Sequence, residues 1–218
     1  MNLANHGFAI RQTSVSEDIL NQLRRTLFHE DCAGERSLLD EPLVRETALI
    51  LKQELSAVGN LYAAAIAIQA IAFNKTASKN WKVAWHQDLM FPFANRVTSQ
   101  GFDLPSIKQG IHYAMPPESV LEQLLAVRLH LDDWDATNGP LRISPGTHLA
   151  GILKTAEISN IVTNHGEITA LARKGDALLM RPLTLHTSSQ ATEPKHRRVL
   201  HFVYYSGNTI SETWHRAI

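Results

Sequence analysis

Four pairs of a histidine and a carboxylate two residues later stand out among the 11 histidines of this 218-residue chain. They are His29/Asp31, His86/Asp88, His130/Asp132 and His165/Glu167. A strand presents residues i and i+2 on one face, so such a pair on extended backbone can bind one metal ion. Together with a distant third ligand, the pair would form the facial two-histidine, one-carboxylate site that is typical of non-haem Fe(II).

The pair His86/Asp88 has the most suitable surroundings. It lies in the segment NWKVAWHQDLMF, where aromatic residues on both sides can keep bulk water away from a reactive metal. His130/Asp132 lies on a predicted strand and remains an alternative, although its acidic residue can equally well end that strand and open a turn.

The other two pairs lie on unsuitable backbone. His29/Asp31 falls at the end of a predicted helix, where residues i and i+2 point about 200° apart. His165/Glu167 lies in VTNHGEIT, whose asparagine and glycine predict a solvated turn. We therefore expect neither pair to bind the metal.

The distant ligand should be a histidine on a late strand. His186, in RPLTLHTSS, fits this description best, and His201 is the second choice. Arg197 follows at the start of the next predicted strand, where an antiparallel return could bring its guanidinium beside the metal. Arginine binds carboxylates through two parallel hydrogen bonds, as a dicarboxylate cosubstrate would require.

Four segments in this order resemble the phytanoyl-CoA dioxygenase-like family of Fe(II)/2-oxoglutarate-dependent oxygenases. They are WHQD (85–88), NGPLRISPGTH (138–148), GDALLMRPLTLH (175–186) and HRRVL (196–200). The resemblance covers roughly residues 60–206. It implies a mainly β fold with flanking α-helices, a cupin-like double-stranded β-helix or jelly roll.

The resemblance also assigns residues to roles. His86, Asp88 and His186 match the family's iron ligands, and Arg197 and Ser188 match positions that bind the far carboxylate of 2-oxoglutarate. It implies that the protein converts 2-oxoglutarate and O2 to succinate and CO2 while hydroxylating a C–H bond. Related halogenases carry a small residue in place of the carboxylate ligand, so the presence of Asp88 favours hydroxylation.

Secondary-structure signals place these residues on a single domain, residues 1–218. Two helices are expected near the start, one capped by Ser14 or Ser16 and one running from about residue 41 to 55. We expect residues 1–58 to pack as helices against a jelly-roll core over 60–206. Strands are expected over 61–73, 124–133, 141–144, 175–189 and 197–206.

Residues 89–120 contain several prolines and glycines without a steady period, so we expect an irregular excursion that serves as a lid. Its candidate substrate contacts are Phe91, Arg96, His112 and Tyr113. Two further candidates, Arg36 and Arg128, lie outside this segment and could meet an acidic group.

Composition limits the partners. The chain has 21 Lys+Arg and 21 Asp+Glu and no block of like charge, which argues against nucleic acid or an anionic membrane surface. Cys32 is the only cysteine and no signal peptide is visible, so a cytoplasmic protein is expected. The longest apolar stretch, 61–73, is too short to span a bilayer.

A small organic metabolite is the expected substrate, and the sequence leaves the oligomeric state open. Two alternatives remain. One is a jelly-roll protein that binds metal or a small molecule without turnover, and the other is a cupin-like metal-dependent isomerase.

Overall fold

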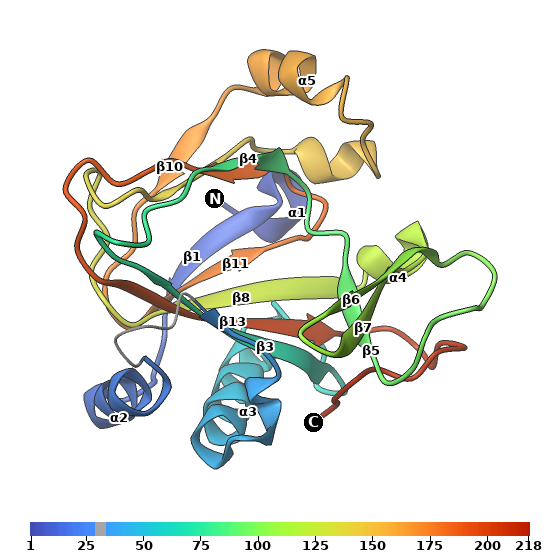
Figure 1. Ribbon diagram of the computed structural model, residues 1–218, viewed down its shortest axis with the longest axis horizontal. Coiled ribbons are helices and arrows are strands. Elements are labelled where there is room, and N and C mark those ends of the chain that lie inside the picture. Colours follow the sequence, from blue (N-terminus) through green and yellow to red (C-terminus); the bar gives the residue numbers. More distant parts are fainter. Residues whose placement is uncertain (29–33) are drawn as a thin grey trace.

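Two antiparallel sheets form the body of the protein (Figure 1). A computed structural model describes residues 1–28 and 34–218. The larger sheet has the order β1 (Phe8–Gln12), β11 (Asp176–Met180), β8 (Leu124–His130), β13 (Arg197–Tyr205), β3 (Ile66–Lys75) and β2 (Gly34–Glu35). The smaller sheet has the order β10 (Ile168–Ala170), β9 (Leu141–Ile143), β12 (His186–Ser188) and β4 (Val83–His86). This arrangement confirms the predicted mainly β jelly-roll fold.

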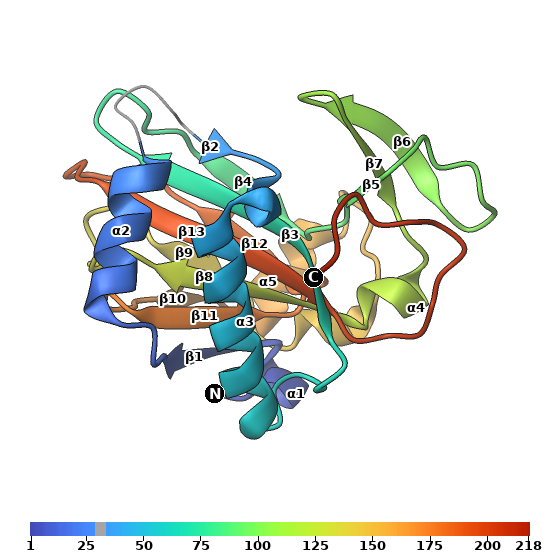
Figure 2. The ribbon, with the colours of Figure 1, turned by 90° about the horizontal axis from the view of Figure 1, so that it is seen from below.

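Two helices cover the outer face of the larger sheet (Figure 2). In α2 (Glu17–Leu27), the side chain of Ser16 accepts a hydrogen bond from the backbone N–H of Ile19, as an N-cap does. The longer helix α3 (Pro42–Ala57) begins with proline at its first position, where the missing N–H costs nothing. Both predicted helices are confirmed.

The remaining helices are short. They are α1 (Leu3–His6), α4 (Glu118–Leu121), α5 (Ile158–His165) and the 3-10 turns Leu38–Asp40 and Thr147–Ala150.

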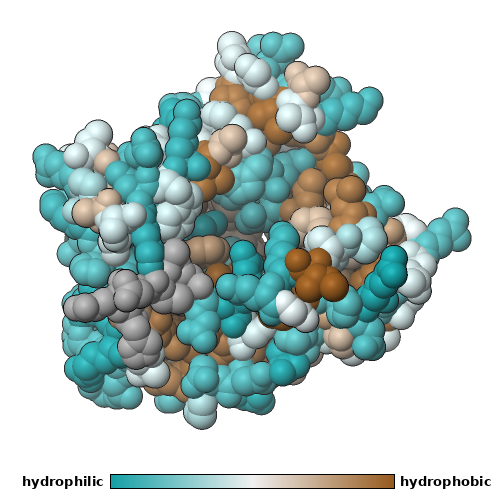
Figure 3. Space-filling view, in the orientation of Figure 1, coloured by the Kyte–Doolittle hydropathy of each residue, from teal (hydrophilic) through white to brown (hydrophobic). Residues whose placement is uncertain are grey.

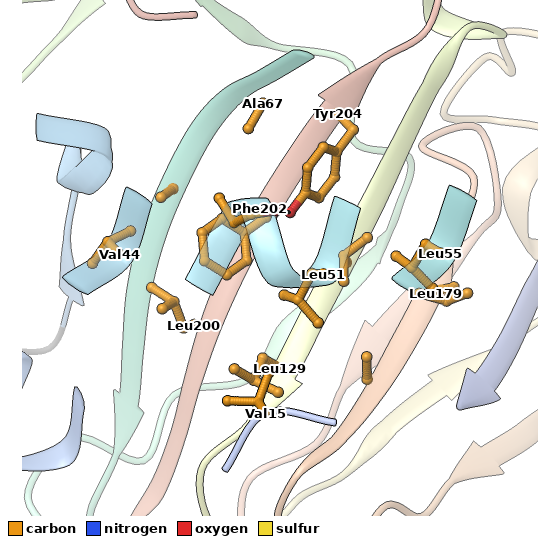
Figure 4. Close-up of a cluster of buried hydrophobic side chains, with 14 of the residues drawn as sticks. Val15, Val44, Leu51, Leu55, Ala67, Leu129, Leu179, Leu200, Phe202 and Tyr204 are labelled. Atoms are coloured by element: carbon orange, nitrogen blue, oxygen red, sulfur yellow. Dashed lines mark hydrogen bonds between the residues drawn. The ribbon is translucent and has the colours of Figure 1, made fainter. Parts of the chain in front are cut away.

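The main apolar core lies between the larger sheet and its two covering helices (Figure 4). Val127 and Leu129 of β8 point into it and are fully buried. Because side chains alternate along a strand, Arg128 and His130 point to the other face, toward the smaller sheet. The helices thus allow the inner face of the sheet to carry polar side chains.

Residues 89–120 fold into a third sheet instead of the expected irregular excursion. It has the order β5 (Phe91–Phe93), β7 (Ile111–Met115) and β6 (Asp103–Lys108). Prolines interrupt two of these strands and most of β6 is exposed, so neither face carries the alternation of apolar residues by which a strand is recognised. The local prediction for this segment was therefore wrong.

Two further predictions about elements were wrong. Residues 1–58 contain the strand β1, which pairs with β11 at the edge of the larger sheet and whose five residues are too few to show a clear period. The expected strand over 175–189 is two strands in different sheets, β11 and β12. Pro182 lies between them, where it cannot donate to a ladder, and the chain turns with Thr184 N–H bonded to Arg181 O.

We predict that Tyr204→Phe lowers the free energy of unfolding by about 0.5–1.5 kcal/mol. The buried Tyr204 hydroxyl donates a 2.8 Å hydrogen bond to the backbone carbonyl of Ala48 in α3, which ties that helix to β13 (Figure 4). Urea unfolding measures the change. Tyr62→Phe, at a side chain that is 69% exposed, serves as the control, and equal stability of Tyr204→Phe and the parent would contradict the prediction.

Candidate functional site

A cavity of about 360 Å³ lies between the two sheets. The space-filling view shows the molecule hollowed near its middle (Figure 3). The wall of the cavity combines the inward side chains of β3, β8 and β13 with residues of β4, β12 and the 89–120 segment. The cavity therefore brings the late strands together with the HQD segment.

His86, Asp88 and His186 meet at this cavity, and their ligand atoms all lie within 4.8 Å of one another. Asp88 Oδ1 is 3.7 Å from His86 Nε2, and Asp88 Oδ2 is 3.7 Å from His186 Nε2. The two histidines are cross-strand partners in the pairing of β4 with β12. Asp88 lies just past β4, after Gln87, and its backbone N–H donates to Pro182 O at 2.9 Å.

Backbone carbonyls orient both imidazole rings. His86 Nδ1 lies 2.9 Å from Ala84 O, and His186 Nδ1 lies 3.0 Å from Thr184 O. A carbonyl only accepts, so each Nδ1 carries the proton and each Nε2 presents its lone pair toward Asp88. This is the tautomer that a metal ligand needs.

The ionisation of the cluster also suits a metal. Burial raises the pKa of the Asp88 carboxyl, but four nearby groups whose charged forms are positive together lower it more, so that it falls to about 2; they are His186, His86, His201 and Arg128. Burial lowers the pKa of His186 to about 4. Two imidazoles and one carboxylate that converge on one point are the donor set that an Fe(II) ion would fit.

Gln87, between two of the ligands, is buried at the edge of the cavity, and its amide binds neighbouring loops. Its amide group donates to Gly151 O at 2.8 Å and to Leu183 O at 2.7 Å, and its oxygen accepts from Leu153 N–H at 2.9 Å. These bonds fix the backbone that carries His86 and Asp88. This role was not predicted from the sequence, because the backbone groups that Gln87 binds belong to loops far along the chain and no motif marks them.

Thr147 holds the backbone before His186 in a similar way. Its hydroxyl donates to Ser144 O at 2.8 Å and accepts from Leu185 N–H at 2.9 Å. The PGTH segment thus positions the distal histidine.

Two basic side chains, Lys75 and Arg197, meet around the hydroxyl of Ser188, and we call these three residues the Arg197 cluster. Lys75 Nζ lies 2.8 Å from Ser188 Oγ, and both terminal nitrogens of Arg197 lie 3.5 Å from the same oxygen. Lys75 and Arg197 are cross-strand partners on β3 and β13. Arg197 and Ser188 meet as the sequence analysis expected, whereas Lys75 was missed because a lone lysine in a polar turn carries no motif.

Aromatic rings support the two cations of this cluster. The Arg197 guanidinium lies 4.7 Å from the centre of the Trp134 ring, and Lys75 Nζ lies 5.4 Å from that of Trp81. Burial, and then the charge of Arg197, lower the pKa of Lys75 to about 7. No carboxylate of residues 1–28 or 34–218 pairs with either cation, so the cluster is ready to accept an anion.

Arg198 points to the opposite face of β13. It forms a bidentate ion pair with Asp132, with nitrogen to oxygen distances of 2.9 and 2.7 Å. Asp132 is thus occupied by an ion pair. The alternative pair His130/Asp132 is not part of the three-residue cluster. His130 is buried against Trp134, with ring centres 3.8 Å apart.

The other histidines considered from sequence lie elsewhere. His165 Nδ1 is 3.0 Å from Pro145 O, and Glu167 pairs with Arg142. His29/Asp31 lies outside the described residues. His201, the second choice for the distal ligand, lines the cavity but is not part of the three-residue cluster.

Four of the six candidate substrate contacts line the cavity, namely Arg36, Phe91, Tyr113 and Arg128. Arg96 is exposed and, like His112, is not among the described residues of the wall. His112 neighbours Tyr113 on β7 and so points to the other face of that strand. Lys108, at the exposed rim, is a lining residue that the sequence analysis did not consider.

The family model for phytanoyl-CoA dioxygenase (PhyH) matches residues 8–199. Among curated protein sequences, none matches this chain.

Solved structures share the fold at low sequence identity. EctD from S. alaskensis, in its apo form, aligns with a TM-score of 0.68 and 16% identity over 94% of this chain and 74% of EctD. AviO1 from Streptomyces viridochromogenes Tue57 aligns with a TM-score of 0.64 and 16% identity over 96% of this chain and 94% of AviO1. HygX from Streptomyces hygroscopicus, with nickel and 2-oxoglutarate bound, aligns with a TM-score of 0.64 and 17% identity over 93% of this chain and 83% of HygX.

The described residues contain no helix long and apolar enough to cross a membrane.

We predict that Gln87→Leu weakens metal binding about 10–100-fold, because the ligands lose the hydrogen bonds that hold their backbone. Calorimetric titration with Ni(II), which avoids oxidation, measures this affinity. Gln53→Leu, at an exposed position of α3, is the matched control. Unchanged Ni(II) affinity in Gln87→Leu would show that the backbone holds its place without this side chain.

We also predict that the metal-free protein loses stability as the pH falls below about 6.5. Burial lowers the pKa of His186 to about 4, of His201 to about 3, and of His130 well below 6.5. The unfolded chain binds protons at these histidines that the folded chain does not. Each contributes up to about 1.4 kcal/mol per pH unit until its folded-state pKa is reached.

Urea unfolding between about pH 7.5 and pH 5.5 measures this slope. His201→Leu should reduce it by the contribution of one proton. A free energy of unfolding that does not change over this range would contradict the prediction.

Proposed function

The chain belongs to the phytanoyl-CoA dioxygenase family of Fe(II)- and 2-oxoglutarate-dependent dioxygenases, and we propose that His86, Asp88 and His186 are its iron ligands. It acts on a small molecule and uses 2-oxoglutarate and O2 as cosubstrates. Bound iron supplies the activation of O2 that drives attack on an unreactive C–H bond. The roles below are those of the chain's own residues.

The three ligands hold the metal from one side only. Asp88 supplies the negative charge, and the two imidazoles, held in one tautomer by Ala84 O and Thr184 O, supply neutral donors. All three side chains line the cavity, so a metal that they held would be accessible to the cosubstrates and the substrate from there.

The Arg197 cluster binds the far carboxylate of 2-oxoglutarate. Arg197 offers a planar pair of donors, Lys75 a compact ammonium group, and Ser188 a hydroxyl between them. Charge-assisted contacts from Arg197 and Lys75 hold one end of the cosubstrate and so orient it toward the metal ligands.

Aromatic and apolar side chains complete the wall and keep bulk water from the reacting atoms. Trp81, Phe91 and Trp134 belong to this wall. The sheet of β5, β7 and β6 contributes Tyr113 and Lys108 and serves as the lid over the site.

One observation supports this function over the two alternatives: the same cavity holds a three-ligand cluster at one place and an anion-binding cluster at another. A metal-dependent isomerase has no need of a second site for a dicarboxylate cosubstrate. In a binder that has lost turnover, we would expect a missing or obstructed ligand, whereas all three ligands line the cavity.

We predict that the protein forms succinate from 2-oxoglutarate only with Fe(II) and O2, and that His86→Ala and Asp88→Ala abolish this formation. Succinate measured by mass spectrometry gives the result, and Ni(II) affinity confirms that the metal is lost. His165→Gln and Glu167→Gln, from a second histidine–acid pair outside the cavity wall, are matched controls. Turnover in Asp88→Ala comparable to that of the controls would refute the ligand assignment.

We predict that Arg197→Gln weakens 2-oxoglutarate binding by about 3–5 kcal/mol, more than a hundredfold, because the carboxylate loses its bidentate partner. Arg197→Lys should restore part of the affinity. Ser188→Ala removes one hydrogen bond and should cost about 0.5–1.5 kcal/mol. Titration of the anaerobic Fe(II) protein provides the affinities.

Arg198→Gln is the control, because its side chain pairs with Asp132 on the other face of β13. A large loss for Arg198→Gln with little for Arg197→Gln would reverse the proposed assignment.

A further inference from the structure

The charges around the cavity do not balance once the proposed iron and cosubstrate are in place. The charged residues of the described wall are the four cations Arg36, Lys108, Arg128 and Arg197 and the single anion Asp88. Fe(II) and the 2-oxoglutarate dianion carry equal and opposite charges. Leaving aside Lys75, which belongs to the Arg197 cluster but is not part of the described wall, three positive charges of that wall remain without a counter-charge.

Arg128 is the innermost of the cations that the proposed function leaves unused. It points inward from the middle of β8, where its guanidinium lies 5.6 Å from the centre of the Phe73 ring. Its Nε is buried without a hydrogen-bond partner, and it forms no ion pair with any carboxylate of residues 1–28 or 34–218. A guanidinium held this way has donors to spare for a ligand.

The strand register places Arg128 in a row of cavity side chains that crosses the larger sheet. Arg128 pairs with His201 of β13, and His201 pairs with Ile71 of β3. Arg36 comes directly after β2 and, by the register of β2 with β3, is level with Ile71. All four residues line the cavity, so the row runs from one cation to another across its wall.

Lys108 of the 89–120 segment approaches the same row from outside the sheet. Lys108 Nζ lies 5.0 Å from the centre of the Tyr113 ring, and the Arg36 guanidinium lies 5.8 Å from it. Two cations thus share one aromatic ring at the rim of the cavity. Neither pairs with a carboxylate among the described residues, so they add to the field of Arg128 instead of being neutralised.

We propose that the substrate is an anion, and that its carboxylate or phosphate group binds to Arg128 with Arg36 and Lys108 drawing it in from the rim. This inference rests on the proposed function, because it assumes that 2-oxoglutarate occupies the Arg197 cluster. It defines the substrate class as small organic acids. Neutral and cationic molecules of the same shape are disfavoured by the uncompensated positive charge.

The test uses the full chain, loaded with Fe(II) and saturating 2-oxoglutarate without O2. The probes are hexanoate and octanoate, each compared with the amide and the amine of the same carbon chain, together with methyl phosphate. Saturation-transfer NMR and calorimetry measure their binding. The visible charge-transfer absorption of an Fe(II)–2-oxo acid chelate reports separately whether the cosubstrate is bound.

We expect acids to bind about tenfold or more tightly than their amides, and amines not to bind. Arg128→Gln should abolish this preference while the chelate absorption remains, and Arg128→Lys should restore part of it. Lys108→Gln should reduce the preference, and it carries the test if Arg128→Gln fails to fold. Arg96→Gln, an exposed cation of the same 89–120 segment, is the matched control.

Equal binding of acid and amide, or no binding of any anionic probe, overturns the proposal. The proposal is also overturned if Arg128→Gln weakens the binding of 2-oxoglutarate and leaves the binding of the acids intact. Arg128 would then bind the cosubstrate. Failure of the proposed function shows differently: the parent protein would form neither the chelate absorption nor succinate.

Discussion

The pairing of His86 with His186 across β4 and β12 is the constraint on which the site depends. Neither strand is long, and neither carries an apolar pattern strong enough to fix its own register. The register comes instead from side chains outside the ladder, namely Gln87 just after β4 and Thr147 beside β12. The turn between β11 and β12 completes the arrangement, because its Pro182 carbonyl accepts the backbone N–H of Asp88.

The larger sheet imposes a different constraint, because it places apolar side chains on one face and polar or charged side chains on the other. The helices α2 and α3 take up the apolar side chains of one face, and the alternate residues carry cations to the other. Burying a cation without a carboxylate is costly. Aromatic rings offset part of that cost, with Trp134 against Arg197, Trp81 against Lys75 and Phe73 against Arg128. The inner face is therefore built to attract negative charge.

The sequence was most informative where one residue type has few reasons to occupy a position. The HQD segment and the late histidine stood out because two inward ligands and a distant third suffice for a facial metal site. The helices followed from their period and caps and the strand-rich second half from alternation, whereas the jelly roll itself was implied by the resemblance to the family.

Distant contacts that no ligand chemistry or family motif marks could not be predicted. Lys75 acquires its place through a register with Arg197 that spans more than half of the chain, and Gln87 through carbonyls contributed by distant loops. The strands of 89–120 were hidden because prolines and exposure remove the alternation by which a strand is recognised.

The Arg197 cluster has a consequence for how the cosubstrate would be measured. Lys75 has a pKa of about 7, lowered by burial and by Arg197, so at neutral pH the free protein carries it partly deprotonated. A carboxylate beside its ammonium group favours the charged form, so binding takes up part of a proton from the solvent. The observed heat of 2-oxoglutarate binding would therefore change with the ionisation enthalpy of the buffer, and the apparent affinity would fall as the pH rises above 7.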